Sequence, residues 1–227
     1  YLVPIFYESH NVKVKVVATG TGQALRNAKD CNADLLLVHS QNDEIKFISD
    51  GHGLDRYYLM YNDYIIVGPS SNLAKISSSD TAKTVFFKIK ESDVKFISRA
   101  DASGTNKKEL SLWLSYGFNV ENFDSKWYIE SGQGMGATLN IAIGMNAYTF
   151  TDRSTWLRFD NKHNHQILHE SRDDFKNIYS LVTVNPSSCP NTKTELAGVF
   201  VDWILSSKGT ELINSYLING NRVFYAD

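Results

Sequence analysis

Residues 98–109 read SRADASGTNKKE, and this stretch decides how the rest of the fold is interpreted. The apolar run 94–97 before it predicts a strand, while Leu110, Trp113 and Leu114 after it recur at helical spacing. The stretch is therefore a turn from a strand into a helix. At such a turn the first backbone N–H groups of the helix lack intrahelical partners and lie at the positive end of its dipole. This arrangement favours a bound anion.

The polar side chains of this turn suit an oxyanion. Arg99 offers a planar fork that can grip two oxygens, and the Ser103 and Thr105 hydroxyls add further donors. Gly104 lets an oxyanion approach the backbone closely. We expect Asp101, which can only accept hydrogen bonds, to orient Arg99 instead of contacting the anion. The alternative is an ordinary helix N-cap at Ser103 or Thr105, with Arg99 in a surface ion pair.

A second turn of this kind lies near the N-terminus. Residues 19–23 read TGTGQ and separate a strand predicted at 12–17 from a helix predicted at 23–30. A plain tight turn is the alternative, because the stretch lacks the full nucleotide-binding patterns. If it contacts the same anion as Arg99, its candidate residues are Thr19, Gly20 and Thr21.

Two further positions are candidate contacts. A glycine-rich turn at 132–134 opens a predicted helix at 134–145 and adds Gly134 and Met135. Ser40 follows an apolar strand predicted at 33–38. Ligands of open α/β sheets bind at the carboxyl ends of the strands, where Ser40 is expected.

Strands and helices alternate along the chain with short connections, which predicts an α/β fold. A further helix is expected over 80–91, and the long apolar segments 57–67 and 178–184 predict strands. Near the C-terminus, residues 192–195 read TKTE and form a capping box ahead of a helix. The apolar residues expected on one face of that helix are Leu196, Val199, Phe200, Trp203 and Ile204.

The string Arg99-x-Asp101-x-Ser103-Gly104-Thr105 resembles the signature of periplasmic oxyanion-binding proteins, among them phosphate receptors. Segments 17–25, 33–39, 61–69 and 128–136 resemble, in order and spacing, the tungstate-binding (TupA) components of bacterial tungstate ABC transporters. The likeness covers nearly the whole chain.

The resemblance implies a two-lobed periplasmic binding protein fold of type II, with the ligand in a cleft between the lobes. Lobe one is expected at 1–67 plus 176–227 and lobe two at 68–175, with 57–67 and 178–184 carrying the chain across. The family also has a Thr/Ser-rich strand before the helix that begins at Tyr1, and this sequence does not contain it.

The function implied is capture of tungstate and its delivery to ABC permease subunits by a monomer in the periplasm or on a lipid anchor. Molybdate, sulfate and phosphate are the alternative ligands, because donors alone do not separate them. Tungstate is fully ionised at neutral pH, so a donor-only site is expected, with an affinity that is flat from about pH 6 to 8.

Other classes of function are disfavoured. The net charge of -2 without a Lys/Arg block argues against nucleic acid, and no apolar run is long enough to span a membrane. No signal peptide precedes Tyr1, so export is inferred from the resemblance. No serine lies in a Gly-x-Ser-x-Gly elbow, so we assign no catalytic residue and no cofactor. The effector domain of a transcription regulator shares the fold but requires a helix-turn-helix, which these residues lack.

No metal site or disulfide is assigned. His163, His165 and His169 lie in a polar stretch that favours a solvated loop or hairpin over metal ligands. Cys31 and Cys189 are far apart in sequence and are expected to be buried or incidental thiols, although an oxidising compartment would permit a bridge if they met.

Overall fold

The computed structural model describes residues 1–171 and 173–227, which form two compact units. Unit 1 comprises Tyr1–Asn62 and Asn177–Asp227, and unit 2 comprises Asp63–Lys176. The chain passes from one unit to the other inside β2 (Gly53–Pro69) and returns at the start of β7 (Lys176–Val184). These strands contain the apolar segments for which the sequence predicts that role. The predicted lobes differ from the units at residues 63–67 and 176.

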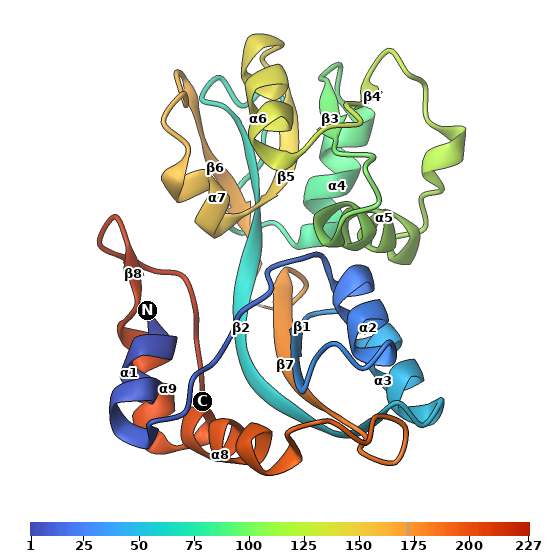
Figure 1. The fold of residues 1–227 in the computed structure, drawn as a ribbon. Coiled ribbons are helices and arrows are strands. Elements are labelled where there is room, and N and C mark those ends of the chain that lie inside the picture. The colour runs from blue at the N-terminus through green and yellow to red at the C-terminus, as the bar shows by residue number, and fades with distance from the viewer. Residues whose placement is uncertain (172) are drawn as a thin grey trace. The chain divides into compact units, whose positions relative to one another are not determined.

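In unit 1 the strand order is β1-β7-β2, and β1 pairs antiparallel with β7. Helices α2 and α3 cover one face of these strands, and α1, α8 and α9 lie on the other side (Figure 1). Successive side chains of β7 point to opposite faces of the sheet, so both faces are covered. Leu181 packs with the α1, α8 and α9 side chains, and Val182 packs with those of α2 and α3. The elements are α1 (Leu2–His10), α2 (Thr21–Lys29), β1 (Leu35–Val38), α3 (Gln41–Ser49), α8 (Thr194–Leu205), α9 (Ser207–Ser215), β8 (Leu217–Ile218) and β9 (Asn221–Arg222).

In unit 2 the strand order is β2-β5-β3-β4, and β6 also pairs with β2. Strands β4 and β5 both run parallel to β3, so the carboxyl ends of all three strands lie at one edge. The elements are α4 (Ala82–Glu91), β3 (Phe96–Ser98), α5 (Gly104–Ser115), a 3₁₀ turn (Val120–Asn122), β4 (Tyr128–Glu130), α6 (Met135–Gly144), β5 (Tyr148–Asp152), α7 (Arg153–Arg158) and β6 (His165–Glu170).

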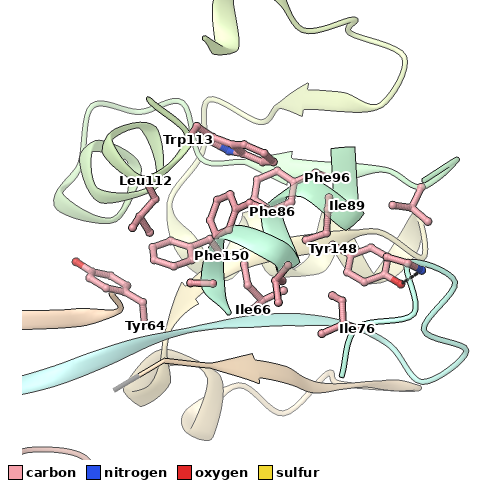
Figure 2. Packing of buried hydrophobic residues seen from close by; sticks show 14 of the residues in the cluster. Tyr64, Ile66, Ile76, Phe86, Ile89, Phe96, Leu112, Trp113, Tyr148 and Phe150 are labelled. Atoms are coloured by element: carbon pink, nitrogen blue, oxygen red, sulfur yellow. Dashed lines mark hydrogen bonds between the residues drawn. The ribbon is translucent and has the colours of Figure 1, made fainter. Parts of the chain in front are cut away.

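The main core of unit 2 lies between this sheet and helices α4 and α5. Phe86 and Trp113 contact each other edge to face, with ring centroids 4.5 Å apart, and Ile66 and Phe150 cover them from the sheet (Figure 2). The opposite face of the sheet packs on α6, which contributes Leu139. Because helices pack on both faces of this sheet, the β3–α5 turn is held in place at the end of the sheet where β3 stops.

The prediction of a strand at 12–17 is wrong, because residues 11–20 form neither helix nor strand. Val12 and Val14 are partly buried against the core around Phe6, whereas Val16 and Val17 are 68% and 62% exposed. A period of two shows only that alternate side chains face a core. A strand also needs a hydrogen-bonded neighbour, and no described strand pairs with this segment.

The C-terminal helix forms, and Trp203 and Ile204 of its predicted apolar face are buried, but its cap and two other residues of that face differ from the prediction. Lys193 is the N-cap of α8, and its N–H donates to Asp34 Oδ1 over 2.8 Å, so an acceptor from another segment replaces the expected capping box. Ala197, Val201 and Ile204 are buried at i, i+4 and i+7 spacing, while the predicted Leu196 and Val199 are 46% and 38% exposed.

Cys31 and Cys189 form a disulfide, with their Cα atoms 5.3 Å apart, so the expectation of separate thiols is wrong. Cys31 precedes β1 and Cys189 follows β7. Leu35, at the start of β1, pairs with Thr183 near the end of β7. The antiparallel pairing therefore brings both cysteines to the same end of the two strands, which their separation of 158 residues does not reveal.

Candidate anion-binding site

The β3–α5 turn has an unusual backbone. Ala100 and Ala102 have φ values of 48° and 57°, in the left-handed region that non-glycine residues rarely adopt. Such a residue costs on the order of 1–3 kcal/mol and persists where its surroundings hold it. Here Asn106 Oδ1 accepts from the Ala102 N–H at 3.2 Å, and Asp101 Oδ1 accepts from the Ser103 N–H at 3.2 Å. Strain held in this way is typical of functional turns.

The helix cap and the anion site are compatible at Ser103 and Thr105. Ser103 is the N-cap of α5, and its Oγ accepts from the Asn106 N–H at 3.3 Å. Thr105 Oγ1 accepts from Arg99 Nη1 at 3.4 Å. A hydroxyl that accepts in this way keeps its own hydrogen for another partner. The Thr105 hydroxyl can therefore donate to a ligand while it holds the turn, and the Ser103 hydroxyl, which also bonds to Asp101, can do so by turning from Asp101 to the ligand.

Arg99 has the expected partner, and one of its three guanidinium nitrogens has no partner among the described residues. Its Nη2 forms an ion pair with Asp101, which confirms the predicted contact between the two side chains. Its Nε is buried and has no hydrogen-bond partner among the described residues. A buried donor without an acceptor is costly, so this atom indicates where an acceptor from a ligand belongs.

Asp101 is ionised at neutral pH. Burial raises its pKa, but the hydrogen bonds from Ser103 and the charge of Arg99 outweigh burial and hold the pKa below its usual value. Each oxygen of the carboxylate accepts one hydrogen bond from the turn, Oδ2 from Arg99 Nη2 and Oδ1 from the Ser103 N–H. This fits a residue that orients Arg99.

The turn after β4 lies beside the β3–α5 turn. The Ser131 N–H donates to Ser98 O at 2.9 Å, and Ser131 Oγ donates to Arg99 O at 3.2 Å. Gly132 has φ 61°, and Gly134 is the N-cap of α6 with no capping hydrogen bond from a described side chain. The first N–H groups of α6 are thus available at the same edge as those of α5. The Met135 side chain packs in the core, so only its backbone N–H is suited to a ligand.

In unit 1, α2 also begins at a glycine. Gly20 is its N-cap, and no described side chain caps it. Thr19 Oγ1 donates to Gly20 O at 3.1 Å. Ser40 differs, because its N–H donates to Glu44 at 2.6 Å and its hydroxyl donates to Asp43 at 2.6 Å. Both Ser40 donors are engaged by carboxylates, whereas the α2 terminus has the open form expected of an anion contact. The contacts of Thr19, Gly20, Thr21 and Ser40 with a ligand stay predictions.

A second arginine follows directly after a parallel strand, but carboxylates already balance its positive charge. Arg153 follows β5, and its Nε donates to both oxygens of Asp63 at 2.8 and 2.9 Å. Its Nη2 forms ion pairs with Asp63 and Glu170. With two carboxylates against one guanidinium, Arg153 offers an anion less than Arg99 does.

The histidine stretch contains a strand, so its prediction as a solvated loop or hairpin is wrong for two of the three residues. His165 and His169 lie in β6 and are 6% and 5% exposed, while His163 is exposed. Burial lowers the pKa of both strand histidines. The described residues contain no cluster of His, Cys, Asp and Glu that could hold a metal ion.

Sequence reasoning missed Glu109, a buried carboxyl below the β3–α5 turn. It is 2% exposed and accepts hydrogen bonds from Ser98 Oγ at 2.6 Å, Tyr128 OH at 2.7 Å and Trp113 Nε1 at 3.0 Å. Burial raises its pKa to about 7, against the opposing effect of these three hydrogen bonds. The available signal was its place four residues before Trp113, on the inward face of the predicted helix.

The chain resembles one family of proteins in both sequence and structure. Residues 1–208 match the PBP superfamily domain. The chain is 43% identical over 218 residues to the tungstate-binding protein TupA of Peptoclostridium acidaminophilum, which covers 95% of this chain and 75% of that protein. It is 37% identical to TupA of Campylobacter jejuni, over 100% of this chain and 84% of that protein. The solved structure of TupA from Desulfovibrio alaskensis G20 has a TM-score of 0.93 at 35% identity, over 100% of this chain and 91% of that one. Among the described helices, none has the length and apolarity needed to cross a bilayer.

Proposed function

The chain belongs to the PBP superfamily and resembles its TupA tungstate-binding proteins, and from this premise we propose that it captures a tetrahedral oxyanion, tungstate first, and delivers it to an ABC permease. The observation that carries the proposal is Arg99. Its guanidinium is oriented by Asp101, and its buried Nε lacks an acceptor among the described residues, beside two hydroxyls that can still donate. No bond is made or broken in this function.

The proposed contacts in unit 2 are donors. Arg99, Ser103, Gly104 and Thr105 supply side-chain and backbone hydrogen atoms from the β3–α5 turn, and Gly134 and Met135 supply backbone N–H groups from the start of α6. In unit 1, Thr19, Gly20, Thr21 and Ser40 are proposed on their residue types and places in the chain.

Tungstate is placed before phosphate because, among the described residues of the β3–α5 turn, both oxygens of the one carboxylate are already engaged by the protein. Phosphate carries a proton near neutral pH, and a receptor gains from a carboxylate that accepts it. Asp101, the carboxylate of the turn, already accepts from Arg99 and Ser103. Tungstate needs no such acceptor. Molybdate offers the same donor pattern, so tungstate is placed before it on the relatives' names.

We place the protein outside the cytoplasm, as a monomer that meets the permease when loaded. The Cys31–Cys189 disulfide supports this location, because disulfides persist in oxidising compartments.

Calorimetric titration with tungstate, molybdate, sulfate and phosphate in parallel tests the proposal. Tungstate should bind tightly, and sulfate and phosphate should bind far more weakly. Phosphate outcompeting tungstate at equal concentration would move the assignment to a phosphate receptor, and molybdate outcompeting tungstate would move it to a molybdate receptor.

A further inference from the structure

Glu109 joins the elements that carry the unit 2 contacts. It projects from α5, accepts from Ser98 at the end of β3 and from Tyr128 at the start of β4, and also accepts from Trp113 of its own helix. The β3–α5 turn follows Ser98 directly, and the turn that opens α6 follows β4. One carboxyl therefore holds both turns of the candidate site.

A chain of hydrogen bonds continues from Glu109 to the strained backbone. Ser98 Oγ, which donates to Glu109, accepts from Asn106 Nδ2 at 3.4 Å. Asn106 Oδ1 then holds the N–H of the left-handed Ala102, and the Asn106 N–H is capped by Ser103 Oγ. The path from the carboxyl to the proposed anion donors thus runs through two buried side chains, Ser98 and Asn106.

We propose that Glu109 is a positioning residue for the oxyanion site, acting through Ser98 and Asn106, and that it takes up a proton from solvent when the oxyanion binds. The inference rests on the proposed function of that site. The physical reason is that a bound dianion opposes a second negative charge nearby in a poorly solvated interior.

The proton has a defined place on the carboxyl. Oε1 accepts from Trp113 Nε1, which can only donate, so Oε1 remains an acceptor. The proton therefore goes to Oε2, and the hydrogen bond with Ser98 reverses so that Ser98 Oγ accepts it. The buried charge is removed, and the carboxyl keeps its contacts with both strands.

The other charged and titratable groups near Glu109 do not take up the proton in its place. Tyr128 and Glu130 of β4 face it, and the charge of Glu130 favours its neutral form. Burial and the Glu109 charge raise the pKa of Tyr128, so that phenol stays protonated. On the other elements packed against α5, Tyr148 of β5 bonds to the Ala74 N–H, and Glu121 of the 3₁₀ turn is exposed beside Asn119.

The affinity for the anion should depend on pH through Glu109. Burial places the pKa of free Glu109 at about 7, and a bound anion raises that pKa further. Binding therefore takes up a proton around neutral pH, and the affinity falls as pH rises above about 7. If the bound anion lowers the ionisation constant of Glu109 about tenfold, the affinity for the anion falls roughly fivefold between about pH 6 and 8. The sequence predicts an affinity that does not change with pH, because it does not reveal the burial of this carboxyl.

Calorimetric titration of the protein with sodium tungstate, near pH 7 in two buffers of different ionisation enthalpy, measures the protons taken up per anion. The wild-type protein should take up a fraction of a proton. Glu109→Gln should take up none, and its affinity should be nearly independent of pH. The control Glu130→Gln should keep the uptake, with its maximum at a lower pH, because the Glu130 charge raises the pKa of Glu109.

Tyr128→Phe covers the case in which Glu109→Gln fails to fold. It keeps the carboxyl but removes a hydrogen bond that favours ionisation, so the pH of maximal uptake should rise. Unchanged uptake in Glu109→Gln, an unmoved maximum in Tyr128→Phe, or tungstate binding without uptake overturns the inference alone. Absence of binding to every oxyanion overturns the proposed function, and this inference with it.

Discussion

Replacing Arg99 by alanine should weaken tungstate binding at least tenfold. The guanidinium uses one N–H of Nη2 for Asp101 and one N–H of Nη1 for Thr105, and its buried Nε is the nitrogen that has no partner among the described residues. One charged hydrogen bond contributes about 1.5–3 kcal/mol, which corresponds to roughly a tenfold to hundredfold change in affinity. This is a lower bound, because the substitution also frees the Asp101 charge to oppose the anion.

The assay is calorimetric titration of Arg99→Ala, Arg99→Lys and the control Lys126→Ala. Lys126 is exposed and precedes β4, so it lies at the amino end of that strand, away from the candidate site. Its loss changes the net charge equally and should leave the affinity within about twofold. Arg99→Lys should not restore wild-type binding, because an ammonium cannot reproduce the planar fork. Wild-type affinity in folded Arg99→Ala would remove Arg99 from the site.

Three further predictions concern the charge, the disulfide and the backbone. Asp101→Asn should lower the affinity modestly for every oxyanion; a changed ranking in parallel titrations would show that Asp101 contacts the ligand. Because its pKa lies below the usual value, the stability that Asp101 adds should be present above about pH 4 and be lost as pH falls further, which acid unfolding of wild type and Asp101→Asn can compare. Reducing Cys31–Cys189 should cost about 2–4 kcal/mol in urea unfolding, and an unchanged midpoint would contradict a structural role for the bridge. Ala102→Gly should stabilise the protein by about 0.5–1 kcal/mol by relieving its left-handed φ, whereas Ala137→Gly, on the exposed face of α6, should destabilise it by a similar amount; equal signs in thermal unfolding would refute the strain at Ala102.

The sequence located the β3–α5 turn and the helices at 21–29, 82–91, 104–115 and 135–144 because these features are local. Apolar spacing, glycine and the Ser103 cap act within a few residues of one another. The Arg99–Asp101 pair is local too, since its members are two positions apart. The proposed ligand was also within reach, because the family's motifs stand in order along nearly the whole chain.

Tertiary structure decided whatever depends on a distant partner. The Val12–Val17 alternation did not become a strand because no described strand pairs with it, and the disulfide formed because β1 and β7 are neighbours. Glu109 shows the same for the site. Sequence spacing places it on a helix near Trp113, but its burial and its bonds to Ser98 and Tyr128 arise only when β3 and β4 pack against α5. Burial is a property of the assembled interior, and it is the largest of the causes that raise the pKa of Glu109 to about 7.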